Sequence, residues 1–67
     1  MTFAEKVKFV RSKLQISQED LAKQIEVSRI TVNRWESREL QPQFLTEQRF
    51  EAFCREHGIN FNTETNK

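Results

Sequence analysis

Side chains able to recognise the edges of nucleic-acid bases lie close together between residues 29 and 34. Arg29 and Asn33 are one helical turn apart, and Arg34 follows directly. A guanidinium can donate two hydrogen bonds to a guanine, and an amide can pair with an adenine in the same way. Ile30 adds an apolar side chain that could touch a thymine methyl group. One helix that exposed all four residues could therefore read bases, and a merely solvated helix face is the alternative.

The apolar residues around this segment predict that helix and another one just before it. Helical spacing predicts a helix over 18–25, with Leu21, Ala22 and Ile25 on one face. A second apolar set predicts a helix over 29–36, and it consists of Val27, Ile30 or Thr31, Val32 and Trp35. Each helix follows a serine that can cap it, Ser17 or Ser28. Only Glu26 and Val27 remain between the helices, so the helices must cross steeply and touch near the turn.

The stretch SQEDLAKQIEVSRITVNRWE resembles the helix-turn-helix of the Cro and phage-repressor (XRE-like) family. The residues that carry the likeness are Ser17-Gln18, Leu21-Ala22, Val27-Ser28, Thr31-Val32 and Arg34-Trp35-Glu36. The resemblance covers residues 3–45 closely and implies an all-α DNA-binding domain. It places Ser28, Arg29, Ile30, Asn33 and Arg34 beside DNA. It also implies a salt bridge between Arg11 of the first helix and Glu36, which would fix the angle of the reading helix.

Two glycines typical of that family are missing from this chain. Glu26 stands at the turn, where a non-glycine residue with positive φ costs on the order of 1 kcal/mol. The second glycine is replaced within Ser37-Arg38-Glu39, so we expect an altered loop over residues 37–45.

Several polar residues around the two helices are candidates for contacts with DNA phosphates. Gln18 begins a helix whose N-terminal amides favour an anion, and the resemblance implies that it holds the backbone or braces the third helix. Ser17 and Ser28 are first of all caps and could also bond a phosphate. The loop adds Arg38, Gln41 and Gln43. Such contacts set position and salt dependence without reading sequence.

The remaining chain predicts two more helices and a short tail. The first helix is expected over 3–14, capped by Thr2 and Glu5, with Phe3, Val7, Val10 and Leu14 facing the core. The fourth should begin near residues 44–46, end by His57 and bury the stripe Phe50, Phe53, Cys54 and His57. Gly58 suits its C-terminus, with Ile59 in hydrophobic contact.

These elements give a small all-α helix-turn-helix domain of four helices over 1–58 and a tail over 59–67. The tail alternates apolar and polar residues from Ile59 to Thr63, so it fits a short strand paired with the same strand of a second copy. The alternative is that Ile59 and Phe61 tuck under the fourth helix.

Composition bounds the molecule. A chain of 67 residues makes one small domain, with six Phe, one Trp and the aliphatic residues available for its core. The net charge is +1, but residues 1–38 hold eight Lys or Arg against five acids, and residues 39–67 hold three against five. The basic part could face DNA. A single cysteine, no secretory signal and no membrane-spanning run fit a protein of the cytoplasm, and the resemblance implies a bacterial or phage origin.

The sequence therefore predicts a sequence-specific regulator of transcription, a repressor that binds double-stranded DNA as a homodimer. The main alternative is an antitoxin or protein-interaction module, and a nonspecific nucleoid binder is the third option. No cofactor, metal or enzymatic activity is expected. Cys54 and His57 are too few ligands for structural zinc, and no nucleophile has a base beside it.

Overall fold

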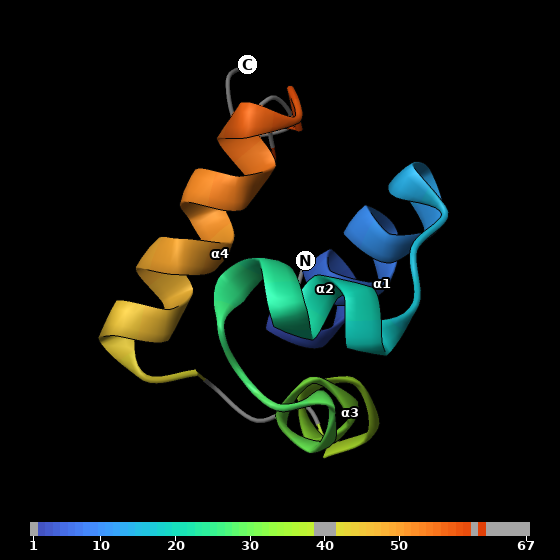
Figure 1. Cartoon of the computed structure of the whole chain (residues 1–67), viewed down its shortest axis with the longest axis vertical. Helices are drawn as coiled ribbons and strands as arrows, with labels where there is room; N and C mark the ends of the chain where they lie inside the picture. Colours follow the sequence, from blue (N-terminus) through green and yellow to red (C-terminus); the bar gives the residue numbers. More distant parts are fainter. Residues whose placement is uncertain (1, 39–41, 60, 62–67) are drawn as a thin grey trace.

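The computed structural model describes residues 2–38, 42–59 and 61, and these form four helices and no strand. The helices are α1 (Phe3–Leu14), α2 (Gln18–Ile25), α3 (Arg29–Arg38) and α4 (Phe44–Glu56). Figure 1 shows α2 crossing α3 steeply, while α4 runs along one side of the molecule. The predicted all-α helix-turn-helix architecture is confirmed. None of the described helices has the length and apolar character needed to cross a membrane.

Hydroxyl side chains start the first three helices. Thr2 and Glu5 form a reciprocal capping box, in which the Glu5 N–H donates to Thr2 Oγ1 at 3.2 Å. Ser17 and Asp20 form a second box at the start of α2. Ser28 accepts from the Thr31 N–H at 3.1 Å and begins α3. Each such cap stabilises its helix by about 1 kcal/mol, so local sequence fixes where these helices begin.

Three helices end in the same kind of turn. The residue in the left-handed region has a φ of 57° at Gln15, 63° at Glu26 and 72° at Gly58. The N–H of the following residue then bonds to a carbonyl five residues back, as in the 2.8 Å bond from Ile59 to Cys54. The positive φ expected at Glu26 is present, and that of Gln15 was not expected. The residues after the turns are apolar and pack on the core: Ile16, Val27 and Ile59.

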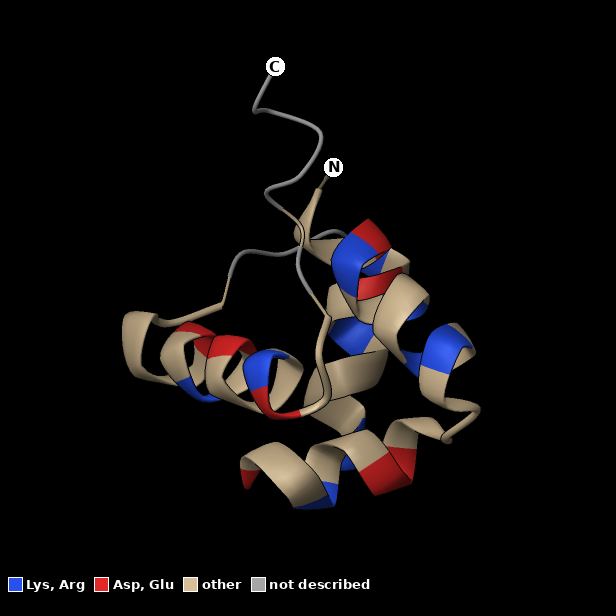
Figure 2. Ribbon diagram, turned by 90° about the horizontal axis from the view of Figure 1, so that it is seen from above, with Lys and Arg blue, Asp and Glu red and all other residues tan. Residues whose placement is uncertain are grey.

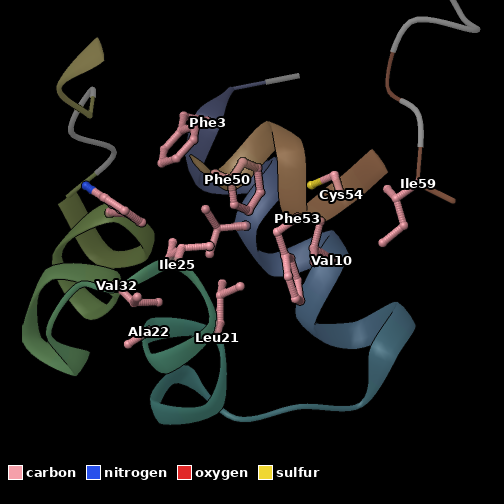
Figure 3. Packing of buried hydrophobic residues seen from close by; sticks show 12 residues of the cluster. Phe3, Val10, Leu21, Ala22, Ile25, Val32, Phe50, Phe53, Cys54 and Ile59 are labelled. Carbon is pink, nitrogen blue, oxygen red and sulfur yellow. The ribbon is translucent and has the colours of Figure 1, made fainter. Parts of the chain in front are cut away.

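All four helices contribute side chains to one hydrophobic core (Figure 3). Leu21 and Val32 are fully buried where α2 meets α3, and Ala22 beside them is 2% exposed. The Phe3 ring lies edge-on to Trp35, with ring centroids 5.0 Å apart, and edge-on to Phe50 at 5.1 Å. This aromatic trio joins α1, α3 and α4, so α3 is fixed to the rest of the domain.

The structure corrects three expectations. Helix α3 extends two residues past its predicted end to Arg38, and the Ser37 hydroxyl bonds to the Asn33 carbonyl in this added turn. Not all six phenylalanines are in the core, because Phe9 is 43% and Phe44 is 70% exposed. His57 is exposed and lies outside the buried stripe, since α4 ends at Glu56 and the backbone turns there.

The first part of the tail packs on the domain. Ile59 is 5% exposed and belongs to the core. The Phe61 ring lies edge-on to Phe9, with centroids 5.7 Å apart, and Lys6 Nζ is 5.5 Å from its centroid. Ile59 therefore follows the tucked arrangement, whereas the aromatic and cation contacts of Phe61 are with α1 and not with the fourth helix. The proposed strand also needs Asn60 and residues 62–63, which lie outside the described residues, as does any dimer contact of the tail beyond Phe61.

Candidate nucleic-acid interface

Helix α3 has one buried face and one exposed face. Val32 is fully buried and Trp35 is 4% exposed. The side chains predicted to contact bases are all exposed, and they are Arg29, Ile30, Asn33 and Arg34. The exposed fraction of Ile30 is 57%, so Thr31, which is half-buried, takes the inward position that the sequence left open between them. The four residues thus share one accessible helix surface.

A two-residue turn sets the position of this surface. Glu26 adopts the left-handed conformation and the Val27 N–H bonds to the Ala22 carbonyl at 2.9 Å. Ser28 then begins α3, and its hydroxyl lies 2.9 Å from the Thr31 hydroxyl. Ala22 is small enough to let α3 approach α2 closely, so a larger residue there would displace the reading helix.

A two-bond ion pair joins the end of α3 to α1. Arg11 Nε donates to Glu36 Oε2 at 2.7 Å, and Arg11 Nη2 donates to Glu36 Oε1 at 3.0 Å. Arg11 Nη1 also donates to the Ile16 carbonyl at 3.2 Å. The Glu36 side chain is 8% exposed and that of Arg11 is 26% exposed. Such paired geometry restricts orientation as well as distance, so it fixes the rotation of α3 about its own axis.

The pKa values of both partners are displaced in favour of the charged pair. Burial alone raises the pKa of Glu36, but the hydrogen bonds from Arg11 and Gln18 and the positive charges of Arg11 and Lys8 together outweigh it, and the net pKa is lowered. The hydrogen bond to Glu36 raises the pKa of Arg11. Glu36 therefore stays ionised at neutral pH despite its burial.

Gln18 extends this ion pair to the exposed face of α3. Its Nε2 donates to Glu36 Oε1 at 3.1 Å, and its Oε1 accepts from Asn33 Nδ2 at 3.4 Å. The chain of contacts therefore runs from Arg11 through Glu36 and Gln18 to Asn33. An amide nitrogen carries two protons, so Gln18 and Asn33 each retain one donor for another partner. The sequence implied that Gln18 could brace α3, but it gave no sign of the bond to Asn33.

The other predicted phosphate contacts have different surroundings. Ser17 and Ser28 are exposed and their hydroxyls are used in helix caps. Arg38 is exposed in the last turn of α3. Gln43 caps α4 through its backbone conformation, and its side chain makes no capping hydrogen bond. Gln41 lies outside the described residues.

The distribution of positive and negative residues among the helices does not distinguish α3 from the other three. Figure 2 shows Lys or Arg and Asp or Glu positions on the same helices, so no helix is of one sign. The exposed face of α3 carries the guanidinium groups of Arg29, Arg34 and Arg38 and the amide of Asn33, while the one acid of this helix, Glu36, is nearly buried and paired with Arg11.

Comparison with known proteins agrees with this geometry. A family model described as helix-turn-helix matches residues 7–53, which include most of α1, all of α2 and α3, and most of α4. The chain belongs to the XRE-like helix-turn-helix family. It is a helix-turn-helix domain of a class that binds DNA and regulates transcription. No curated protein and no solved structure matches it.

The described residues give little indication of a metal site or of a reactive thiol or imidazole. No group of three His, Cys, Asp or Glu side chains among them could hold a metal ion. Burial, and then the charge of Glu51, raises the pKa of Cys54 to about 11, so its thiol is protonated at neutral pH. The His57 ring lies 4.4 Å from that of Phe53, between centroids, and serves packing.

Proposed function

We propose that this protein is a sequence-specific repressor of transcription, which inserts α3 into the major groove of double-stranded DNA. The contact chain from Arg11 to Asn33 is the observation that carries the proposal. A helix face that must read bases has to be held in a fixed orientation. Here a partly buried ion pair holds the end of α3 and a bridging amide reaches the exposed Asn33.

The roles of the base-contacting residues follow from their side chains. Arg29 would donate two hydrogen bonds to a guanine, and Asn33 would pair with an adenine through its amide oxygen and its second nitrogen proton. Arg34 would contact a base or a phosphate, and Ile30 a thymine methyl. Among the described residues neither arginine forms an ion pair, so both guanidinium groups are available.

Phosphate contacts would set the position of the domain on DNA. Gln18 would use the proton that Glu36 leaves free, and one residue would thus couple backbone binding to the orientation of Asn33. The remaining proposed contacts are Ser17, Ser28, Arg38, Gln41 and Gln43.

We place the domain in the cytoplasm of a bacterium, where it would bind sites in the bacterial genome or in the genome of a phage.

A single small domain makes few base contacts, so we propose that two copies bind together. Half-sites of a palindromic operator would then be about one helical turn, or 34 Å, apart. Promoter occlusion by such a dimer needs no cofactor and no catalytic residue.

The test is selection of bound sequences from a random duplex library, followed by titration of the selected site at two salt concentrations. We expect a motif with two-fold symmetry. Arg29→Ala should cost roughly 1–3 kcal/mol and relax the preference at one base pair, whereas Gln18→Ala should weaken all sequences. No enriched motif, or a uniform loss from Arg29→Ala, would refute base reading.

A protein-interaction or antitoxin role is the second candidate, and one observation favours it. Phe44 and Leu45 are 70% and 68% exposed at the start of α4. Of the other aromatic residues considered for such a patch, Phe53 is buried and Phe61 is half-buried. A domain that selected no DNA motif but captured one partner through Phe44 would fit this second role.

A further inference from the structure

A groove with an apolar floor lies between α1 and α4, outside the proposed DNA contacts. Its volume is about 560 Å³. Its floor is made by Phe3 of α1, Phe50 and Cys54 of α4, and Ile59 after α4, with Phe61 at one end. No residue that lines the groove is one of the proposed base or phosphate contacts, so the groove is a separate surface.

The charged residues on the α4 side of the groove are arranged in a self-complementary order. Glu47, Glu51 and Arg55 lie at spacings of four residues, so they share one face of α4. Lys6 of α1 stands on the opposite wall. Among the described residues none of these four side chains forms an ion pair within the molecule.

An exposed apolar side chain, that of Phe44, lies further along the same face of α4. Phe44 is three residues before Glu47, which puts it on the face that lines the groove, and it is 70% exposed. About 15 Å of helix, at 1.5 Å per residue, separates Phe44 from Cys54. At the far end an added Cβ on Gly58 would have no heavy atom within 4 Å, so that end is open.

We infer that a second copy of this chain covers the groove, with the two α4 helices antiparallel about a two-fold axis near Glu51. In a two-fold interface each contact occurs twice with the roles exchanged. Glu47 of each copy then faces Arg55 of the other, and the two Glu51 side chains meet between the Lys6 side chains of both copies. The Phe44 ring of each copy occupies the open end beside Gly58 of the other.

This arrangement selects a second copy over an unrelated partner because the pattern complements itself. Antiparallel pairing places acids opposite the Arg55 end, and it places a projecting ring opposite an opening on the same surface. One helix pair is at the small end of specific interfaces, so the dimer should dissociate on dilution. The inference rests on the proposed homodimer and names its surface.

The experiment is sedimentation of the full chain without DNA over a range of concentrations. We expect the average mass to rise about two-fold as monomer becomes dimer. Phe44→Glu should move the midpoint at least roughly tenfold higher, as for an aromatic anchor. Leu45→Glu is the matched control, because Leu45 is 68% exposed but lies one residue along, on a different face. It should leave the midpoint unchanged.

Charge exchange tests the pairing itself. Glu47→Arg and Arg55→Glu should each weaken association, and the double variant should recover it, because the pair is restored with its signs reversed. Emission of the single buried tryptophan, Trp35, verifies that each variant is folded. A monomeric wild type, equal effects of Phe44→Glu and Leu45→Glu, or no recovery in the double variant would overturn the inference.

Binding to a DNA duplex with one half-site separates this inference from the proposed function. Phe44→Ser, which adds no negative charge beside the proposed phosphate contact Gln43, should bind the half-site as the wild type does and lose cooperative binding to the full site. A wild type that selects a DNA motif yet never dimerises through α4 would refute the α4 surface alone. A dimer that selects no motif would refute the DNA-reading function alone.

Discussion

Replacing Glu36 with glutamine should destabilise the domain strongly even though the shape of the side chain is conserved. The carboxylate accepts two hydrogen bonds from Arg11 and one from Gln18, and it is 8% exposed. In Glu36→Gln one oxygen becomes an NH₂ group, which has to face a donor. The variant therefore loses one charge-assisted bond, weakens the others and leaves the Arg11 charge unpaired.

The magnitude follows from the burial of both partners. Breaking a buried ion pair by removing one charge costs about 3–5 kcal/mol. Arg11 is 26% exposed, so water can partly replace its lost partner and we expect a cost near the lower limit, about 3 kcal/mol. A domain of 67 residues has a total stability of roughly 3–10 kcal/mol. The melting temperature should fall by roughly 12–24 °C.

Urea unfolding followed by the emission of Trp35 measures this change, because Trp35 is the only tryptophan and is buried. Glu19→Gln is the matched control. Glu19 is exposed, its contact with Lys23 is 3.8 Å, and its loss should cost less than about 1 kcal/mol. A cost below about 1 kcal/mol for Glu36→Gln would refute the reasoning.

The same pair predicts a dependence on pH. The pKa of Glu36 in the folded state lies below its ordinary value of 4.5, so the carboxylate stabilises the fold above that value. This stability is lost as the pH falls through the folded pKa. The difference between wild type and Glu36→Gln should therefore be constant near neutral pH and shrink in acid. A difference that had already disappeared at pH 4.5 would contradict the lowered pKa, because a carboxylate with a lowered folded pKa still stabilises the fold there.

Three further predictions concern stability and reactivity. Glu26→Gly should be more stable than Glu26→Ala by about 1 kcal/mol in urea unfolding, because only glycine adopts the positive φ without strain. Both variants lose the 3.9 Å contact with Arg49, so that loss does not affect the comparison. Equal stabilities would show that the turn is not strained. Ile59→Ala should cost about 2–5 kcal/mol in the same assay, and a loss below 1 kcal/mol would place Ile59 outside the core. The Cys54 thiol, with its pKa raised to about 11, should react with a disulfide reagent at pH 8 far more slowly in the folded chain than in urea, and equal rates would contradict its burial.

Much of this architecture could be predicted because its determinants are local. The serine caps, the apolar spacing and the short turn are signals within one or two helical turns, and they gave α1 and α2 at their observed bounds. The positive φ of Glu26 was expected from the resemblance, because the family usually has a glycine at this turn. The position of Arg11 relative to Glu36 came only from the resemblance, since 25 residues separate them.

The sequence by itself determined the four helices, the turn and the residue types on the exposed face of α3. Only the tertiary structure decided which of those residues are connected. The bond from Gln18 to Asn33 exists because α2 and α3 cross closely at Ala22. The spacing of apolar residues along the sequence does not give the distance between these two side chains. Helical spacing had already predicted that Phe3 and Phe50 are buried, whereas only the packing decided that Phe9 and Phe44 are exposed, because exposure depends on which neighbouring segment covers a side chain.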